Sequence, residues 1–193
     1  MSAIQATSQR TLAVDETRLN AFMGNFVHDL GAVMHAATIV VGDKLGLYKA
    51  LADAPLTAEA LAQRTETDAR YVREWLSAQA ASGYVEYDPT TERFSLSDEQ
   101  AFARTVEGGP ALIPGAVQIA VAQFKAIAKM AAAMRTGLGL GWHEHDSALF
   151  HGTERFFRPG YAANLVSQWI PACDGLHDKL TEYYPSTYGR IMI

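Results

Sequence analysis

The stretch that decides the fold reads Thr67-Asp-Ala-Arg-Tyr-Val-Arg-Glu-Trp-Leu76, followed by Ala81-Ser-Gly-Tyr-Val85. Thr67 can cap a helix over residues 68–82, and Gly83 stands at the C′ position where helices commonly end. The apolar residues of this segment recur at helical spacing: Tyr71, Val72, Trp75, Leu76 and Ala80. The pattern predicts a helix that buries this face, with Trp75 and Leu76 in the core.

Short elements flank this helix on both sides. Upstream, Thr57 can cap a helix over residues 58–63. Downstream, strand-like runs over residues 84–87 and 93–96 are separated by turn residues at 88–92. With a helix before them, these elements have the order of a winged helix-turn-helix.

A long apolar helix precedes these elements. Its periodic residues predict a helix over residues 19–51 that breaks near 42–46. The apolar face consists of Phe22, Phe26, Leu30, Val33, Met34, Ala37, Val40, Val41 and Leu45. One small winged helix can hardly cover so long a face, and exposed apolar patches mark interfaces. We therefore expect a homodimer contact from Leu19 to Val41, with an intramolecular core as the alternative.

The remainder of the chain predicts an added helical segment. After Ser97, which opens a short helix, glycines and prolines at 108–114 mark a boundary. One long helix is expected over residues 113–135, ended by Gly137-Leu-Gly-Leu-Gly141. Thr153 can cap a helix over 154–158, with Pro159 and Gly160 after it, and residues 161–180 look mostly helical with an interruption near Pro171.

The predicted fold is mainly α: a winged helix-turn-helix with one short β-hairpin, plus the helical segment. The predicted divisions are a flexible lead over residues 1–18, a winged-helix dimerisation domain over 19–107, a helical linker or lid over 108–180 and an irregular tail over 181–193.

Composition limits the possible classes. The chain has 193 residues, of which 49% are hydrophobic, which excludes global disorder. Its single cysteine, Cys173, excludes an intramolecular disulfide and every multi-cysteine metal site. No apolar run reaches the length of a membrane span, and residues 1–18 do not have the pattern of a signal peptide. We expect a cytoplasmic protein without a membrane partner.

The charge of the winged-helix motif argues against nucleic acid. Residues 55–98 hold eight acids and four bases, so their formal charge is 4 − 8 = −4. Binding to DNA draws most of its affinity from neutralised phosphates. We therefore expect a scaffold that binds no nucleic acid, with a winged-helix transcriptional regulator or interaction module as the alternative.

The second half of the chain holds histidines that could form a metal or general-base site, and glycines that could form a nucleotide-binding loop. His143-Glu-His-Asp146 places two imidazoles close together, and His151 could add a third, but a loop pair alone fixes no metal geometry. We expect no metal, and treat His143 and His145 as residues at a pocket edge that could act as general bases if a catalytic domain were present. The glycines of residues 137–141 follow a helix rather than a strand, so a helix stop is expected instead of a nucleotide loop.

Several motifs together resemble a known family. They are Gly42-Asp-Lys-Leu-Gly-Leu-Tyr-Lys-Ala-Leu51, Leu56-Thr-Ala-Glu-Ala-Leu-Ala62, the two segments quoted first, and Phe150-His-Gly-Thr-Glu-Arg-Phe-Phe-Arg-Pro-Gly-Tyr161. From residue 20 to residue 180 the chain resembles the N-terminal part of two-domain class I S-adenosylmethionine-dependent methyltransferases, some of which are labelled transcriptional regulators. The resemblance implies dimerisation through the winged helix, and Phe157 and Tyr161 in the wall of the cofactor and substrate cavity.

The sequence departs from that family after Leu180. The family continues with a Rossmann-like domain that opens with a glycine-rich strand, turn and helix, whereas this chain reads Thr181-Glu-Tyr-Tyr-Pro-Ser-Thr-Tyr-Gly-Arg-Ile-Met-Ile193. A truncated gene, a shifted frame or a deliberately shortened chain would each explain this. The expectation is the dimerisation and substrate-lid portion of a small-molecule methyltransferase, truncated before the cofactor-binding domain. No catalysis and no binding of S-adenosylmethionine are expected from this chain alone.

Overall fold

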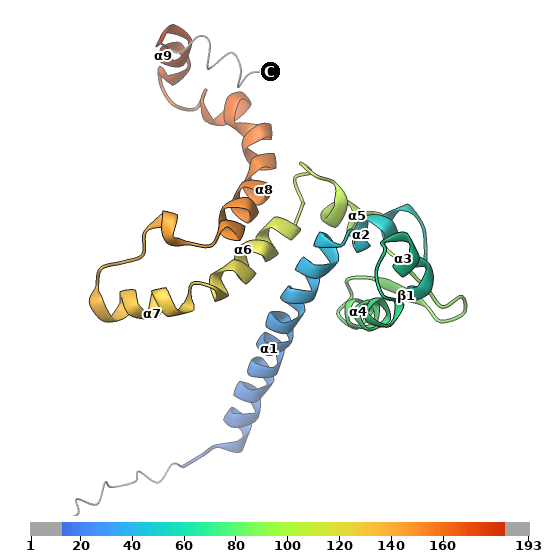
Figure 1. Cartoon of the computed structure of the whole chain (residues 1–193). Coiled ribbons are helices and arrows are strands. Elements are labelled where there is room, and N and C mark those ends of the chain that lie inside the picture. The colour runs from blue at the N-terminus through green and yellow to red at the C-terminus, as the bar shows by residue number, and fades with distance from the viewer. Residues whose placement is uncertain (1–12, 184–193) are drawn as a thin grey trace, which may run out of the picture. The chain divides into compact units, whose positions relative to one another are not determined.

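The computed structural model describes residues 13–183 (Figure 1). Contacts divide the chain into two compact units, Met1–Met34 and His35–Ile193, so that the boundary falls inside the first helix, α1 (Glu16–Lys44). Each unit is described by itself. Within the described residues the fold is mainly helical, with one two-stranded antiparallel hairpin and no parallel sheet. The predicted fold class is confirmed.

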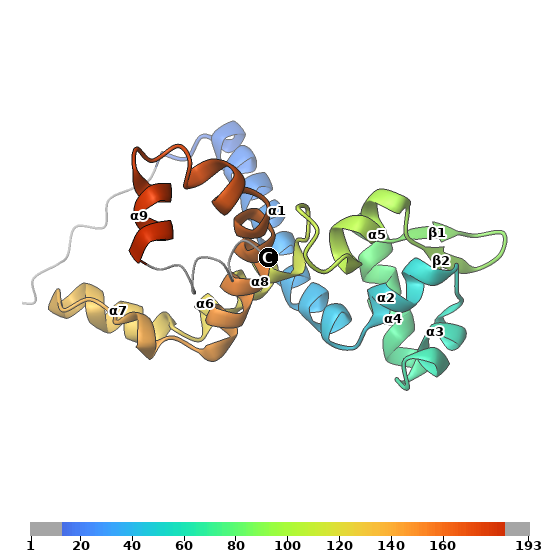
Figure 2. The same ribbon diagram turned by 90° about the horizontal axis from the view of Figure 1, so that it is seen from above.

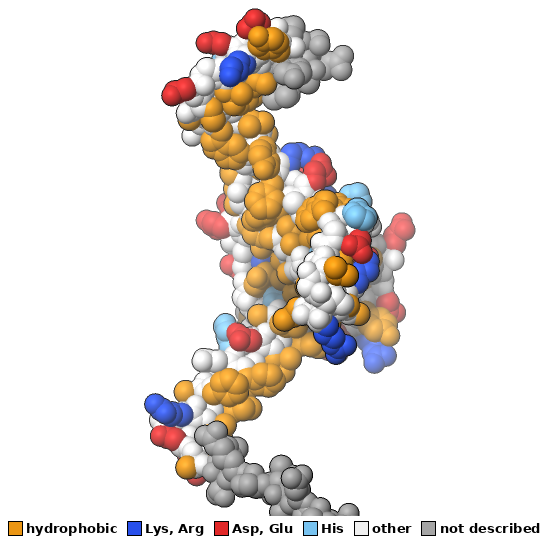
Figure 3. All heavy atoms as spheres, turned by 90° about the vertical axis from the view of Figure 1, so that its left-hand side faces the viewer, with side chains coloured by type: hydrophobic (Ala, Val, Ile, Leu, Met, Phe, Trp, Pro, Cys, Tyr) orange, Lys and Arg blue, Asp and Glu red, His pale blue; other side chains and the backbone are white. Residues whose placement is uncertain are grey.

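The described part of the first unit is the beginning of α1. The helix begins at Glu16, inside the lead predicted for residues 1–18, and the Asp15 carboxylate accepts a hydrogen bond from the Arg18 amide at 3.1 Å. Figure 3 shows hydrophobic side chains along the part of α1 next to the grey N-terminal residues. The exposed large apolar residues are Leu19, Phe22, Met23, Phe26, Val27, Leu30, Val33 and Met34.

The winged helix begins where α1 ends, at the predicted break (Figure 2). Its elements are α2 (Leu47–Asp53), α3 (Ala58–Arg64), α4 (Ala69–Ala81), β1 (Glu86–Asp88), β2 (Arg93–Ser95) and α5 (Asp98–Thr105). The strands pair antiparallel, with Tyr87 opposite Phe94, as the two strand-like runs predict. Leu56 extends the pairing through a bridge to Phe94.

Among the helix N-caps of the winged helix, two agree with the sequence and one differs. The Thr57 hydroxyl accepts from the Ala60 amide, and Ser97 with Gln100 forms a capping box. The prediction that Thr67 caps α4 is wrong. The Asp68 carboxylate accepts from the amides of Arg70 and Tyr71, while the Thr67 hydroxyl lies 2.9 Å from that of Thr65.

Gly83 ends α4 as predicted. It adopts a φ of +70°, and its amide bonds to the Ala80 carbonyl while the Tyr84 amide bonds to that of Gln79. These two bonds form the Schellman arrangement, which satisfies carbonyls that the helix leaves unpaired. The geometry lets the chain leave α4 and enter the hairpin within the four residues 82–85.

The winged-helix core is built on one face of α4. Val72, Trp75 and Leu76 are buried, which confirms the prediction for Trp75 and Leu76, but Tyr71 is exposed and was wrongly placed on this face. Gly42 of α1 packs directly against the Trp75 ring, where a methyl group would overlap it. The Trp75 indole N–H donates to the Thr38 carbonyl at 2.9 Å. Trp75 therefore joins α4 to the last turns of α1.

The helical segment that follows differs from its prediction. Residues 113–135 form two helices, α6 (Pro114–Phe124) and α7 (Ile127–Thr136), bent by 60°, rather than one. The amides of Lys125 and Ala126 bond three residues back instead of four, which ends α6. Gly137, with a φ of +74°, ends α7 as the sequence indicates.

The last elements are a short 3-10 turn over Trp142–Glu144, α8 (Ser147–Asn164), a π-helical turn over Leu165–Trp169 and α9 (Leu176–Tyr183). The expected helix start at Thr153 is wrong. The Asp146 carboxylate caps α8 through the Ala148 amide, and the Thr153 hydroxyl bonds back to the Leu149 carbonyl inside that helix.

Near the end of the chain, the structure differs from the sequence prediction at Pro159 and at residues 181–183. Pro159 lies inside α8, where it removes one helical hydrogen bond without ending the helix. The helices are interrupted around Pro171 as expected. α9 reaches Tyr183, so residues 181–183 are helical rather than irregular, and the remainder of the predicted tail lies outside the described residues.

Over residues 13–183, no single helix combines the length and apolar composition of a membrane span. The bent pairs α1–α2 and α6–α7 meet the two criteria only when each pair is taken together.

Candidate functional site

Helix α8 carries the residues that the family resemblance assigns to a cavity wall, and two glycines hold it against α6. Both Gly115 and Gly152 are buried. A methyl group on Gly152 would lie 3.0 Å from the Gly115 carbonyl oxygen, and one on Gly115 would lie 2.8 Å from the Phe156 amide nitrogen. The two helices thus approach backbone to backbone, and only glycine permits this spacing.

Arg155 of α8 connects the packed helices α6 and α8 to the winged helix. Its Nη1 and Nη2 donate to the two carboxylate oxygens of Asp43, at 2.5 and 2.9 Å. Its Nε and Nη2 also donate to Glu107, at 3.1 and 2.5 Å. The two carboxylates raise the pKa of Arg155, and hydrogen bonding to Arg155 holds the pKa of Glu107 below its ordinary value of 4.5. One guanidinium therefore connects α1, the loop after α5, and α8.

The outer face of α8 is hollowed. A shallow hollow of about 420 Å³ is lined by Thr153, Glu154, Phe157, Arg158 and Tyr161. Glu154 and Arg158, one turn apart on α8, form an ion pair in its lining. The Tyr161 ring meets that of Trp169 edge to face, with centroids 5.4 Å apart. We call this surface the α8 hollow.

The structure brings Phe157 and Tyr161 together, but places the histidine candidates elsewhere. His145 is half-buried and lines a separate hollow of about 180 Å³ with Lys125, Lys129 and Glu144. His143 is exposed in the 3-10 turn, and His151 is exposed on α8. Within residues 13–183, no three His, Cys, Asp or Glu side chains converge as metal ligands would. The assigned roles of His143, His145, Phe157 and Tyr161 stay predictions.

The residues of this part of the chain do not fit S-adenosylmethionine as a complete site. Such a cofactor binds where a strand ends in a glycine turn and the next helix presents free amides. The glycines of residues 137–141 follow α7 instead, and Gly137 closes that helix in a left-handed conformation. The α8 hollow offers one aromatic wall, formed by Phe157 and Tyr161.

A polar cluster inside the winged helix was not found from the sequence. Gln79 is fully buried; its Oε1 accepts from the Tyr48 hydroxyl at 2.6 Å, and its Nε2 donates to the Thr38 hydroxyl at 2.8 Å. His35 Nε2 lies 3.1 Å from the same Gln79 oxygen. The apolar periodicity of α4 did not indicate this cluster, because Gln79 lies on the buried face of the helix, where the period predicts an apolar residue.

Arg104 of α5 lies beside this cluster and is 6% exposed. Its guanidinium carbon is 4.9 Å from the Tyr48 ring centroid and 4.0 Å from that of Tyr84. Its Nε and Nη1 are buried without a hydrogen-bond partner among the described residues. Burial lowers the pKa of Arg104 and raises that of the Tyr48 phenol.

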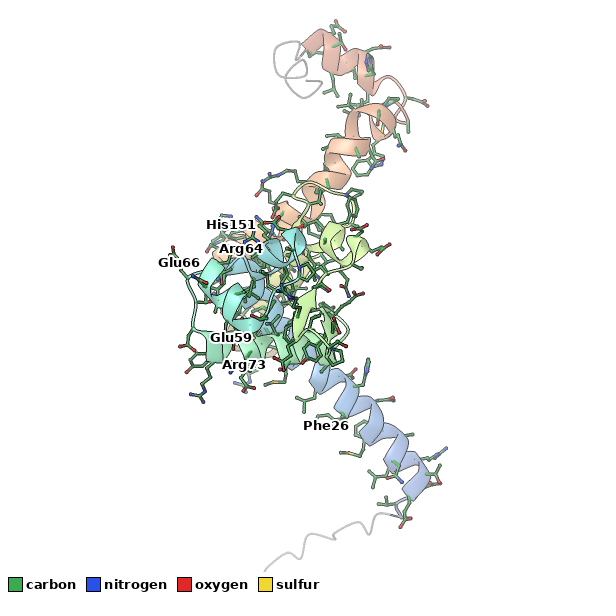
Figure 4. The ribbon with its side chains drawn as sticks, turned by 90° about the vertical axis from the view of Figure 1, so that its right-hand side faces the viewer. Phe26, Glu59, Arg64, Glu66, Arg73 and His151 are labelled. Atoms are coloured by element: carbon green, nitrogen blue, oxygen red, sulfur yellow. The ribbon has the colours of Figure 1, made fainter. Side chains whose placement is uncertain are left out.

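One basic residue of α4, the helix that could read DNA, is held in an internal ion pair. Figure 4 shows Glu59 of α3 next to Arg73 of α4, and the two side chains form an ion pair. Hydrogen bonds from its own backbone and from Arg73 lower the pKa of Glu59. These two residues, Tyr87 and Glu92 line a hollow of about 530 Å³ between the helices and the hairpin.

Comparison with known proteins identifies the winged helix. Residues 33–105 match the model of the Rv2258c-like winged HTH domain. No curated protein matches the sequence significantly. The chain thus carries a winged helix-turn-helix of this kind, as the order of its elements predicts.

Solved structures share the fold over most of the chain. The mitomycin 7-O-methyltransferase MmcR matches with a TM-score of 0.58 and 21% identity, over 76% of this chain and 47% of that one. CalO1, a methyltransferase in calicheamicin biosynthesis solved in an SAH-bound form, matches with a TM-score of 0.55 and 22% identity, over 78% and 46%. PigF with SAH matches with a TM-score of 0.55 and 18% identity, over 89% and 56%. The chain spans about half the length of these structures.

Proposed function

We propose that this chain is the dimerisation and substrate-lid portion of an S-adenosylmethionine-dependent methyltransferase that acts on a small molecule. The winged HTH match over residues 33–105 and the fold shared with three methyltransferase structures support this assignment. Two of those structures hold S-adenosylhomocysteine, and we include S-adenosylmethionine as the methyl donor in the proposal on that basis.

The observation that carries the lid role is the α8 hollow. Phe157 and Tyr161 are about half exposed, at 49% and 52%, although α8 buries its opposite side against α6. Exposed aromatic rings beside a polar ion pair suit a flat, largely apolar ligand with one or two polar groups. Arg155 and the two glycines hold α8 in place, so the hollow sits on a fixed support.

The dimer role rests on α1. Its apolar face from Leu19 to Val41 stays largely exposed in the described chain, and Phe26 projects from it in Figure 4. Burying such a face is worth roughly 25 cal/mol per Å² of apolar area. A second copy of the chain supplies an identical face and closes a two-fold dimer.

Light scattering and fluorine NMR test the two roles separately. The dimer role predicts a dimer mass at micromolar concentration, and a monomer contradicts it. For the lid role, the chain is labelled with 5-fluorotryptophan and titrated with 2-naphthol as a flat phenolic probe. Trp169, which touches Tyr161, should shift while buried Trp75 stays unchanged.

Two variants make the NMR test decisive. Trp169→Phe assigns the resonance, and the double variant Phe157→Ser with Tyr161→Ser should abolish its shift. An equal shift in the double variant, or none in the parent chain, contradicts the lid role. Calorimetry with S-adenosylhomocysteine should show a dissociation constant no tighter than about 1 mM for this chain alone.

The alternative, a winged-helix regulator, keeps one observation in its favour: the domain match itself. The acids of the motif outnumber its bases, and Arg73 is engaged with Glu59. Mobility shifts of random duplex DNA should therefore show weak binding or none at physiological salt. Sub-micromolar binding that persists as salt is raised would replace the methyltransferase proposal with the regulator.

A further inference from the structure

Helix α7 is amphipathic, but the side that contacts its own chain is the polar one. The Lys129 ammonium donates to the Glu144 carbonyl, and the neighbouring Lys125 pairs with Asp146 at 3.0 Å. Ile127, Met130 and Met134 recur at three- and four-residue steps on another face. Met134 is 89% exposed, and α7 has no buried residue. A helix in a globular protein normally does the reverse.

The charge around α7 limits the kinds of surface that can pack against its apolar face. No Asp or Glu occurs between Glu107 and Glu144, whereas Lys125, Lys129 and Arg135 give that stretch a formal charge of +3. Glu144 and Asp146, which lie beside Lys125 and Lys129, reduce the charge around α7 to 3 − 2 = +1. Two α7 helices packed on each other would set like charges side by side. A cover with an apolar face and a negative charge fits better.

The beginning of α1 has both properties. Eight large apolar residues between Leu19 and Met34 are exposed. Residues 15–34 hold Asp15, Glu16 and Asp29 against Arg18, a formal charge of 1 − 3 = −2. At about 1.5 Å per residue, α7 and residues 19–34 present apolar stripes of roughly 15 and 24 Å, so the shorter fits within the longer.

We propose that, in the dimer, the apolar face of α7 formed by Ile127, Met130 and Met134 receives the residue 19–34 stripe of α1 from the second copy. The proposal rests on the dimer of the proposed function and specifies its contact. Each copy gives one α1 stripe and one α7 face, so the contact occurs twice about the two-fold axis. The two methionines are flexible enough to pack against the phenyl rings of Phe22 and Phe26.

A membrane surface is the other occupant that a basic amphipathic helix could take. Recognition of anionic lipid generally draws on clusters of four to eight free basic side chains. Here Lys125 and Lys129 are already engaged with Asp146 and the Glu144 carbonyl. The second copy is therefore the favoured cover.

Photo-crosslinking between isotopically distinct copies tests the contact without knowledge of its register. The variant Met134→p-benzoylphenylalanine, unlabelled, is mixed with ¹⁵N-labelled chain, irradiated and digested. The expected crosslink joins the light peptide that carries position 134 to a heavy peptide within residues 15–34. The matched control, Thr136→p-benzoylphenylalanine, places the probe on the polar side of the same helix and should give no such heavy crosslink.

The outcomes separate the two proposals. A monomer by light scattering overturns the dimer and this contact together. Two outcomes overturn the contact but leave the dimer in place. In the first, the heavy crosslinks from position 134 fall outside residues 15–34. In the second, the probe at position 136 gives the same heavy crosslinks as the probe at position 134. Flotation of the chain with vesicles that contain phosphatidylserine, abolished by Met134→Asp, would assign the face to lipid instead. If the contact is correct, Met134→Asp should weaken dimerisation by tenfold or more, because the new carboxylate would be buried unpaired. The same new carboxylate on the polar side of the helix, Thr136→Asp, should weaken it far less.

Discussion

Arg155 and Asp43, 112 residues apart in the sequence, form a two-pronged ion pair in which both carboxylate oxygens are bonded. Their side chains are only 21% and 15% exposed. A planar guanidinium matches a carboxylate in this way, and a lysine cannot. The pair therefore sets how the last turn of α1 meets α8.

Replacing Arg155 should lower stability clearly. Arg155→Met leaves Asp43 and Glu107 without their donor, and we expect a loss of about 1–3 kcal/mol in the free energy of unfolding. Urea denaturation measures it. The control is Arg158→Met on the same helix, which removes only an exposed pair with Glu154 and should cost less than about 1 kcal/mol. Equal losses in the two variants would contradict the special role of Arg155.

Trp75 should be among the most costly core residues to truncate. Its ring fills the space between α4 and Gly42, and its N–H is bonded to Thr38. Trp75→Ala should cost roughly 3–5 kcal/mol. Tyr71→Ala, at an exposed position of the same helix, should stay within about 0.5 kcal/mol. A loss below about 1 kcal/mol for Trp75→Ala would mean that the contact with α1 does not persist in solution.

Acid should weaken the Arg155 cluster through Glu107. The pKa of Glu107 is lowered in the folded chain, so its contribution to stability is fully present above the unfolded value near 4.5 and is lost as pH falls through the folded value. Stability measured between pH 7 and pH 3 should therefore decline below about 4.5. Glu107→Gln should flatten part of that decline; a variant with an unchanged profile would show that Glu107 does not titrate against Arg155.

Arg104 should be replaceable by an apolar residue at little cost. Within residues 13–183, two of its buried nitrogens have no hydrogen-bond partner, and burying a charge whose hydrogen bonds are incomplete is unfavourable. Arg104→Met, of similar length, should change the free energy of unfolding by between zero and about +2 kcal/mol in favour of folding. Arg104→Ala should be destabilising, because it leaves a cavity between the rings of Tyr48 and Tyr84. A loss above about 1 kcal/mol for the methionine variant would show that the contacts with the tyrosine rings outweigh the buried charge.

The winged helix could be predicted because its signals are local. Thr57, Ser97 and Gly83 act on backbone groups within a few residues, and each does in the structure what its residue type favours. Where two caps compete, the sequence is ambiguous. Asp68 took the place of Thr67, and Asp146 that of Thr153, in both cases a carboxylate that starts the helix at another residue.

The candidate site could be predicted only in part, for the opposite reason. Phe157 and Tyr161 could be assigned to one cavity wall only through the family resemblance, because the expected helix ended at residue 158, before Pro159. The structure continues α8 through Pro159 and places both residues in one hollow. Arg155, Asp43 and Glu107 come from three separate elements, and nothing near any of them in the sequence indicates the other two. The bend between α6 and α7 has no glycine or proline at residues 125–126, so the sequence carried no sign of it.

The contact between Gly115 and Gly152 also affects how variation at these two sites combines. Each glycine is needed because the other backbone is so close, and a methyl group on either one must push α6 and α8 apart. Once the helices have separated, a second methyl group meets less resistance. The two substitutions should therefore be strongly non-additive. During evolution, the first substitution at either position would therefore carry most of the loss in stability. The second substitution would then meet little further selection against it.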